Sequence, residues 1–170
     1  MTTKQGSLSL LNDPVAQQLL NSSIPGHLAY TWKDGTPRLV PLGFTWTGTE
    51  LVTGTFDNFP KVLALKDGDN VAVTFDSYTY PFKVLYIRGT VHLSSHDGLV
   101  PELAQAGKRM CGKEDGQAFA NMINGMIKAG AFTMLRLSVK PTWVGILDFE
   151  RRFPSSIEKG MEMLAALQQV

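Results

Sequence analysis

The sequence contains a single cysteine, Cys111, so no disulfide can form within the chain. This scarcity is typical of proteins in a reducing compartment, and we expect a cytoplasmic location. No apolar run approaches the roughly 18 residues that a transmembrane helix needs. The first residues, Met1 to Gly6, also lack the cationic start and long apolar run of a signal peptide. We therefore expect no membrane association.

The chain also lacks a strong net charge and the common catalytic motifs. Its formal net charge is +1, which gives no indication of a nucleic-acid-binding surface. His27 is isolated, and His92 and His96 straddle a predicted strand end, so no metal site is expected. No glycine-rich phosphate loop, Ser-His-Asp order or carboxylate pair stands out. These absences suit a protein whose chemistry comes from a bound cofactor, and they indicate no catalytic residue.

What the chain does have is enough apolar sequence for one core. It has 170 residues, of which 44% are hydrophobic, and this predicts a single domain over residues 1–170. Residues 1–11 are expected to form a loose N-terminal arm, and residues 154–170 a C-terminal helix. No internal repeat or domain boundary is apparent.

Hydrophobic patterns predict the order of helices and strands. Asp13 caps a first helix, and turn signals at Asp34-Gly35 and Thr47-Gly48 join the first three strands. Pro141 is expected to separate the last two strands. The remaining elements are expected at 60–65 (helix), 70–76 and 83–94 (strands), 98–108 and 114–129 (helices), and 131–139 and 143–149 (strands). Consecutive strands with tight turns favour a mainly β, α+β fold, an antiparallel barrel with peripheral helices.

The stretch from Asp34 to Lys61 is the best candidate for a binding site. Arg38 lies near the start of one predicted strand and Lys61 follows the end of the next, so antiparallel pairing can bring the two cations together. Thr53 and Thr55 lie between them. Cations, small hydroxyls and backbone N–H groups suit an anionic head group. The alternative is that both cations are solvated and that the threonines reflect ordinary β-propensity.

The order of these segments resembles that of the pyridoxamine 5′-phosphate oxidase-like family, the FMN-binding split β-barrels. The resemblance covers roughly residues 12–95. Its features are an early helix followed by Pro25-Gly26, the run Asp-Gly-Thr-Pro-Arg-Leu-Val-Pro-Leu at 34–42, Thr53-Gly54-Thr55 before Pro60-Lys61, and Arg88-Gly89-Thr90 on a long strand.

This resemblance implies an FMN-dependent oxidoreductase that acts on a small molecule. It implies a homodimer with the cofactor in a groove between subunits. Residues 38–41 would line the flavin, residues 53–55 would contact its ribityl or phosphate oxygens, and Lys61 would hold the phosphate. The residues implied to bind the cofactor are Arg38, Leu39, Val40, Pro41, Thr53, Gly54, Thr55, Pro60, Lys61 and Trp143.

Two departures from the family leave the substrate and cofactor open. Members that oxidise pyridoxamine phosphate have a glutamine where this chain has Val84, and they end in a segment rich in Trp, Arg and His. Here the last segment is rich in Met and Leu, so vitamin B6 is not implied as substrate. One alternative is the deazaflavin F420, whose anionic tail could use Lys33, Lys83 or Arg88. Another is a non-enzymatic protein that binds flavin or haem.

Overall fold

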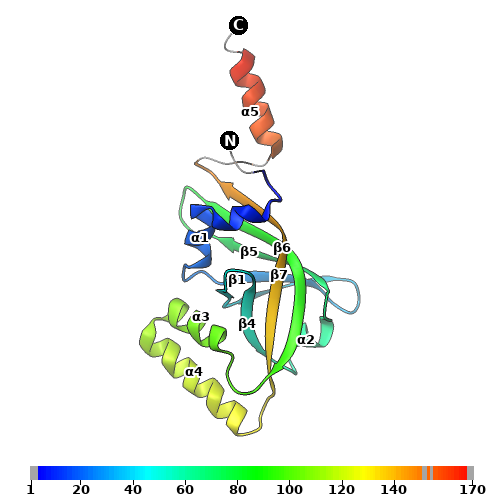
Figure 1. Ribbon diagram of the computed structural model, residues 1–170, viewed down its shortest axis with the longest axis vertical. Helices are drawn as coiled ribbons and strands as arrows, with labels where there is room; N and C mark the ends of the chain where they lie inside the picture. Colours follow the sequence, from blue (N-terminus) through cyan, green and yellow to red (C-terminus); the bar gives the residue numbers. More distant parts are fainter. Residues whose placement is uncertain (1–3, 151–152, 154, 168–170) are drawn as a thin grey trace.

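The computed structural model describes residues 4–150, 153 and 155–167, with a seven-stranded sheet and helices at its edges (Figure 1). A 3₁₀ helix, η1, precedes five α-helices. The strands are β1 (Gly26–Thr31), β2 (Pro37–Leu42), β3 (Thr45–Trp46), β4 (Leu51–Phe56), β5 (Asn70–Asp76), β6 (Lys83–His96) and β7 (Met134–Asp148). The helices are η1 (Leu8–Asn12), α1 (Pro14–Leu20), α2 (Pro60–Ala64), α3 (Pro101–Cys111), α4 (Lys113–Lys128) and α5 (Ser155–Leu167).

The strand order explains how the sheet curls into a barrel. All pairings are antiparallel, in the order β2-β1-β5-β6-β7-β4-β3. The two end strands, β2 and β3, are consecutive in the chain and are separated only by Gly43 and Phe44. One bent segment therefore pairs with β1 at its start and with β4 at its end. This closes the sheet and confirms the predicted antiparallel α+β barrel.

Pro141 does not interrupt the last strand as expected. β7 continues through it from Met134 to Asp148, so the expected break into two strands is wrong. The register with β6 shifts at this point, because Gly89 is opposite Pro141 and Arg88 is opposite Trp143. Proline has no N–H to donate, and a bulge removes the need for that donor.

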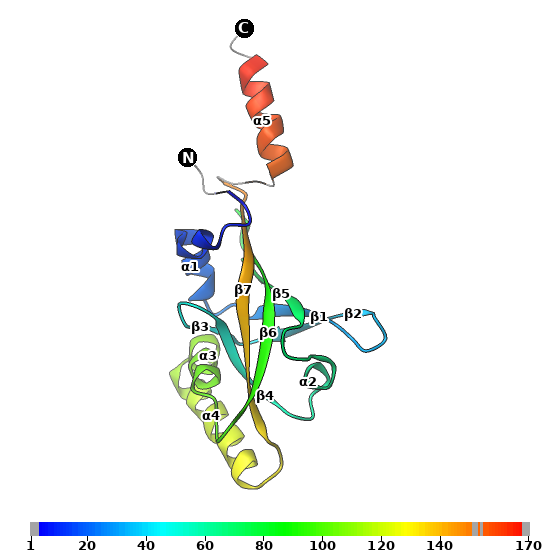
Figure 2. The same ribbon diagram turned by 45° about the vertical axis from the view of Figure 1, so that its right-hand side comes forward.

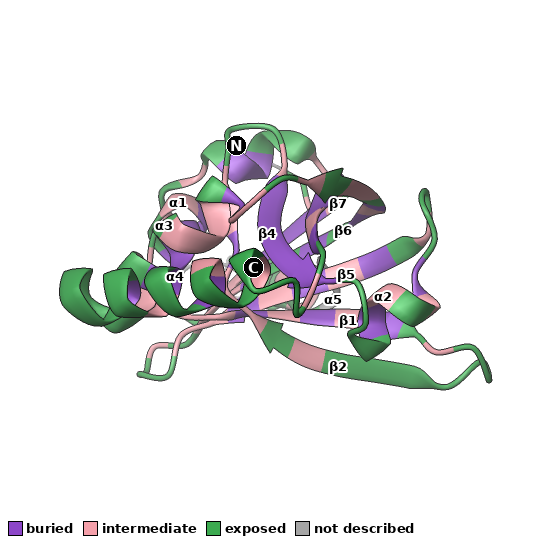
Figure 3. Ribbon diagram, turned by 90° about the horizontal axis from the view of Figure 1, so that it is seen from below, coloured by how far each residue is buried: buried purple, intermediate pink, exposed green. Residues whose placement is uncertain are grey.

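The apolar side chains form two layers of core on either side of the sheet. The larger cluster fills the barrel and includes the fully buried Leu28, Phe75 and Leu137. The smaller cluster, which includes Val52 and Ile123, lies between β4 and the α3–α4 pair. β4 is buried along its whole length, whereas most of β2 is exposed (Figure 3).

The expected loose arm is wrong for the part of it that the structure describes. Leu10 and Leu11 are buried in the barrel core. The Gln5 amide bonds both backbone groups of Ile146, donating over 2.6 Å and accepting over 2.9 Å. The Gly6 N–H donates to the Val144 carbonyl over 2.7 Å. The segment is therefore fastened to β7 by hydrogen bonds and to the core by its leucines.

The remaining helices lie close to their expected positions. The Asp13 carboxylate accepts from the Val15 N–H and caps α1 as predicted. α3 and α4 are antiparallel neighbours beside β4, and α5 continues beyond the end of β7 (Figures 1 and 2). Among the described helices, none combines the length and hydropathy needed to cross a membrane.

Candidate cofactor site

Four of the implied flavin-lining residues lie on β2, which is an edge strand. β2 pairs only with β1 in the described sheet, so its other edge is free of backbone partners there. Pro41 suits this position because an edge strand does not need its missing N–H. Side chains alternate along the strand: Val40 packs on the barrel core, whereas Leu39 points to the outer face and is 65% exposed.

Arg38 is held by the β1–β2 turn. Its guanidinium donates to the Thr36 hydroxyl and to the Pro37 carbonyl, and it lies 3.6 Å from the Asp34 carboxylate. It also stacks 5.9 Å from the centre of the Trp32 ring. Hydrogen bonds from Thr36, with a smaller contribution from Arg38, lower the pKa of Asp34. These contacts position Arg38 at the start of the strand and give its guanidinium hydrogen-bond and ion-pair partners within the turn.

The hydroxyls of the two threonines of β4 differ in their hydrogen bonding. Thr53 and Thr55 lie on one face of the strand and are buried, whereas Gly54 faces α3, where a Cβ would lie 2.9 Å from Leu103. The Thr53 hydroxyl donates to the Gly54 carbonyl over 3.4 Å. The Thr55 hydroxyl is buried and has no hydrogen-bond partner among the described residues. An unpaired buried hydroxyl is costly, which marks Thr55 as a candidate ligand contact.

Lys61 is the most unusual charged residue of the described chain. It lies in the first turn of α2, directly after the exposed Pro60, and is only 5% exposed. No described residue forms an ion pair or hydrogen bond with its ammonium, which lies 4.5 Å from the centre of the Phe59 ring. Burial lowers its pKa from the usual 10.5 to about 8. The part of the chain that the structure describes therefore offers Lys61 no counter-charge.

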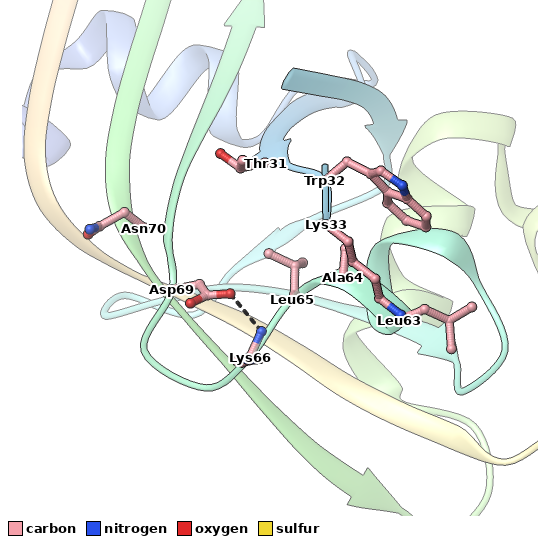
Figure 4. Close-up of a pocket in the computed structure, with 9 residues that line it drawn as sticks. All are labelled: Thr31, Trp32, Lys33, Leu63, Ala64, Leu65, Lys66, Asp69 and Asn70. Atoms are coloured by element: carbon pink, nitrogen blue, oxygen red, sulfur yellow. Dashed lines mark hydrogen bonds between the residues drawn. The ribbon is translucent and has the colours of Figure 1, made fainter. Parts of the chain in front are cut away.

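A first cavity, of about 590 Å³, lies between the β1–β2 turn and α2. Trp32 and Lys33 of the turn lie toward Leu63 of α2 in this cavity (Figure 4). On its other side, the Lys66 N–H donates to the Asp69 carboxylate over 2.8 Å. Helix α2, which begins with Pro60-Lys61, is thus brought beside the turn that holds Arg38.

A second cavity, of about 540 Å³, adjoins the first, because Thr31 and Asn70 line both. It extends across the outer face of the sheet from Pro37 to Trp143. The Arg88 guanidinium stacks 4.3 Å from the centre of the Trp143 ring. Trp143 and the start of β2 therefore border one cavity.

Of the predicted cofactor-binding residues, Trp143 lines the second cavity. β2 contributes Pro37 to that cavity, whereas Arg38, Leu39, Val40 and Pro41 line neither of the two. Thr53, Thr55 and Lys61 are buried and line neither. Of the cations considered for an F420 tail, Lys33 and Arg88 line the cavities, whereas Lys83 bonds Gln18 over 3.2 Å.

Three residues that line the first cavity, Trp32, Lys66 and Asn70, are not among the site residues that the sequence indicated. Their position depends on the pairing of β1 with β5, which short-range sequence patterns do not specify. The described residues contain no group of three or more His, Cys, Asp or Glu that could hold a metal.

Comparison with known proteins identifies the fold but no sequence family. No family model matches the chain, and no curated protein matches it in sequence. Among solved structures, one described as F420 reductase is similar with a TM-score of 0.54 and 22% identity, covering 76% of this chain and 94% of the other.

Two further solved structures show the same architecture. A general stress protein 26-related protein of the pyridoxinephosphate oxidase family from Clostridium acetobutylicum has a TM-score of 0.53 and 14% identity, with coverages of 82% and 89%. HutZ, the haem storage protein from Vibrio cholerae, has a TM-score of 0.53 and 15% identity, with coverages of 80% and 93%. At these identities the similarity establishes the fold alone: the chain has the split β-barrel fold that these three proteins share.

Proposed function

We propose that this protein is a cytoplasmic FMN-binding oxidoreductase that holds its cofactor in a groove between two identical subunits and acts on a small molecule. Lys61 and Thr55 would contact the phosphate and ribityl oxygens. Residues Arg38 to Pro41 would lie along the flavin ring, and Trp143 would border the same groove. The single cysteine supports the proposed compartment.

The Lys61 side chain, which is only 5% exposed and has no counter-charge among the described residues, carries this proposal. A pKa lowered from 10.5 to about 8 corresponds to a cost of at most about 3 kcal/mol when the ammonium stays protonated at neutral pH, because solvent screens part of the charge. Burial of a charge is tolerated when an opposite charge accompanies it. A phosphate dianion would supply that charge, and the adjacent family-like segments Thr53–Thr55 and Pro60–Lys61 make the FMN phosphate the preferred candidate.

The Thr55 hydroxyl supports the same ligand. It is 3% exposed and unpaired in the described chain, so it can donate to an incoming oxygen without losing another hydrogen bond. FMN offers both ribityl hydroxyls and phosphate oxygens. When bound, the flavin ring supplies hydride or single-electron transfer, and the protein supplies position and charge. No residue is assigned a proton-transfer role.

Titration of the apoprotein with FMN tests the proposal. Lys61→Met keeps the length of the side chain and removes its charge, and loss of one charge-assisted contact should weaken FMN affinity about 10- to 100-fold. Lys128→Met, on the exposed face of α4, is the matched control and should bind FMN like the wild type. Equal affinities for wild type and Lys61→Met would contradict the proposal, as would a wild-type protein that takes up no FMN.

F420 is the second candidate, favoured by two further cations. Lys33 and Lys66 line the first cavity, beside α2, where they could meet an anionic tail longer than that of FMN. The double substitution Lys33→Ala and Lys66→Ala separates the two cofactors. If F420 is the ligand, the double variant should lose F420 affinity; if FMN is the ligand, its affinity should stay unchanged. The absorption spectrum of the purified protein would reveal haem directly.

A further inference from the structure

Helix α5 has an apolar face that nothing in the described structure covers. Ile157, Met161, Leu164 and Leu167 follow at helical spacing and are 49%, 51%, 62% and 73% exposed. The charged residues of the helix lie on the opposite side. In both Figure 1 and Figure 2, α5 stands beyond the end of β7, away from the barrel. A free helix of this length is only marginally stable in water.

A second exposed apolar surface adjoins the start of α5. We call it the aromatic ladder: the rings of Tyr80, Phe82, Phe149 and Phe153, which contact edge to face at centroid distances of 5.8, 6.0 and 6.1 Å. Tyr80 is 76% exposed. The Glu158 side chain accepts from the Phe153 N–H over 3.1 Å, so the ladder continues directly into the first turn of α5.

We propose that α5 of one copy packs on the aromatic ladder of a second copy, and that the second copy returns the same contact. Every chain has both surfaces. A twofold axis therefore places α5 of each copy on the aromatic ladder of the other, and the contact forms a closed dimer. The proposal does not depend on the flavin site, which uses β2, β4 and α2.

The exposed area matches what such an interface needs. Tyr78 and three ladder rings, together with the four apolar residues of α5, make eight exposed side chains. At roughly 100 Å² each, they would remove about 800 Å² per copy from water. An interface of standard size buries about this area on each partner. An exposed apolar surface this large is unusual on a monomer.

The charge of α5 argues against a lipid surface as its partner. Its charged residues are Glu158, Lys159 and Glu162, so the polar face has no cationic excess. Helices that lie on anionic membranes usually have lysine and arginine on that face. A protein surface of aromatic rings is the better match for methionine and leucine side chains.

Disulfide trapping between single-cysteine variants tests whether α5 of one copy packs on the aromatic ladder of another. Both variants are built on Cys111→Ser, which removes the natural, exposed thiol. One has Tyr80→Cys in the ladder and the other has Leu164→Cys on α5. After mixing and mild oxidation, with and without FMN, we expect a linked species that contains one copy of each variant. A control pair of Leu164→Cys with Met122→Cys on α4 should stay unlinked.

The specificity of the link is checked by weakening the apolar face. Adding Ile157→Glu and Met161→Glu to the Leu164→Cys chain should lower the yield of the link at least fivefold, while the barrel stays folded because both residues are exposed. The proposal is overturned if the double variant Tyr80→Cys and Leu164→Cys links only within its own chain. It is also overturned if Leu164→Cys links to itself instead of to Tyr80→Cys, or if no link forms.

Discussion

At the scale of single residues, Lys61 makes the stability of the apoprotein depend on pH in an unusual direction. Its folded-state pKa of about 8 lies below the usual 10.5. Below pH 8 both states carry the proton, and a burial cost of at most about 3 kcal/mol opposes folding. Between pH 8 and 10.5 the unfolded state binds more protons, so stability rises by about 1.4 kcal/mol per pH unit from this group.

We therefore expect Lys61→Met to be more stable than the wild type at pH 7, by up to about 3 kcal/mol, and the difference to vanish near pH 10.5. Chemical denaturation of the FMN-free proteins at several pH values measures it. Lys128→Met should parallel the wild type throughout, since Lys128 is exposed. A difference that does not change with pH would show that the ammonium of Lys61 is not buried as described.

The unpaired hydroxyl of Thr55 can be tested by substitution, with Ser138 as the control. Thr55→Val removes the unpaired hydroxyl, and we expect the apoprotein to gain about 1 kcal/mol while FMN affinity falls roughly 3- to 10-fold. Ser138 is also buried with an unpaired hydroxyl, but it faces the α3–α4 side of the sheet beside Val52. Ser138→Ala should therefore gain stability and keep its FMN affinity. If both variants bind FMN like the wild type, Thr55 does not touch the cofactor.

At the same scale, the sequence identifies cations more readily than their surroundings. Arg38 and Lys61 both appear as candidate phosphate ligands. Arg38 has hydrogen-bond and ion-pair partners in its own turn, whereas Lys61 is 5% exposed and has no ion-pair partner among the described residues. The polar partners of Arg38 lie one, two and four residues before it, within reach of pattern analysis. The burial of Lys61 depends on how α2 packs against the barrel, which short patterns do not contain.

At the scale of elements, the bulge between β6 and β7 should be intolerant of added volume. A Cβ on Gly89 would lie 2.3 Å from the backbone oxygen of Lys140, so either strand must shift. We expect Gly89→Ala to lower the free energy of unfolding by about 2–3 kcal/mol. Gly125→Ala is the matched control, because a Cβ there meets nothing within 4 Å inside helix α4.

The control substitution, Gly125→Ala, is expected to change the free energy of unfolding in the opposite direction. Alanine is favoured over glycine in a helix interior, so Gly125→Ala should raise the free energy of unfolding by about 0.5–1 kcal/mol. Denaturant titration of both variants measures the pair. Similar small effects of the two substitutions would mean that β6 and β7 approach less closely at the bulge than described.

Element types were predicted better than element ends and their packing. The Asp13 cap and the apolar periodicity of α4 are local signals, and both helices form. Pro141 was misleading because a proline usually ends a strand, and only the register shift opposite Gly89 shows that a bulge accommodates it. The N-terminal arm was misjudged because Leu10 and Leu11 gain their burial from distant strands.

At the scale of the whole molecule, the proposed cofactor groove between subunits would link FMN affinity to protein concentration. For the wild type we expect the apparent FMN affinity to rise with protein concentration until the dimer is fully formed. Leu39→Asp places a charge on the exposed face of β2 and should weaken FMN binding at every concentration. Fluorescence titrations at several protein concentrations provide the measurement.

A matched control keeps this prediction specific to β2. Met122→Asp adds the same charge on α4, where Met122 is 51% exposed, and its FMN affinity should follow that of the wild type. A wild-type affinity that is the same at all protein concentrations above and below dimer formation would place the flavin within one subunit and refute the shared groove.

Turns, caps and apolar periodicity are set by residues close together in the chain, and they sufficed to predict the antiparallel barrel and most of its helices and strands in order; β7 as one strand and the packed N-terminal segment were the exceptions. The sequence also singled out Lys61 as a candidate cofactor ligand. The closing of the barrel by β2 and β3 as one bent segment is evident only from the folded chain. The same holds for Lys61 and the Thr55 hydroxyl, which have no hydrogen-bond or ion-pair partner among the described residues, and for α5, which no described residue covers. The reason is that burial and pairing depend on residues far apart in the chain, whose meeting no short pattern specifies.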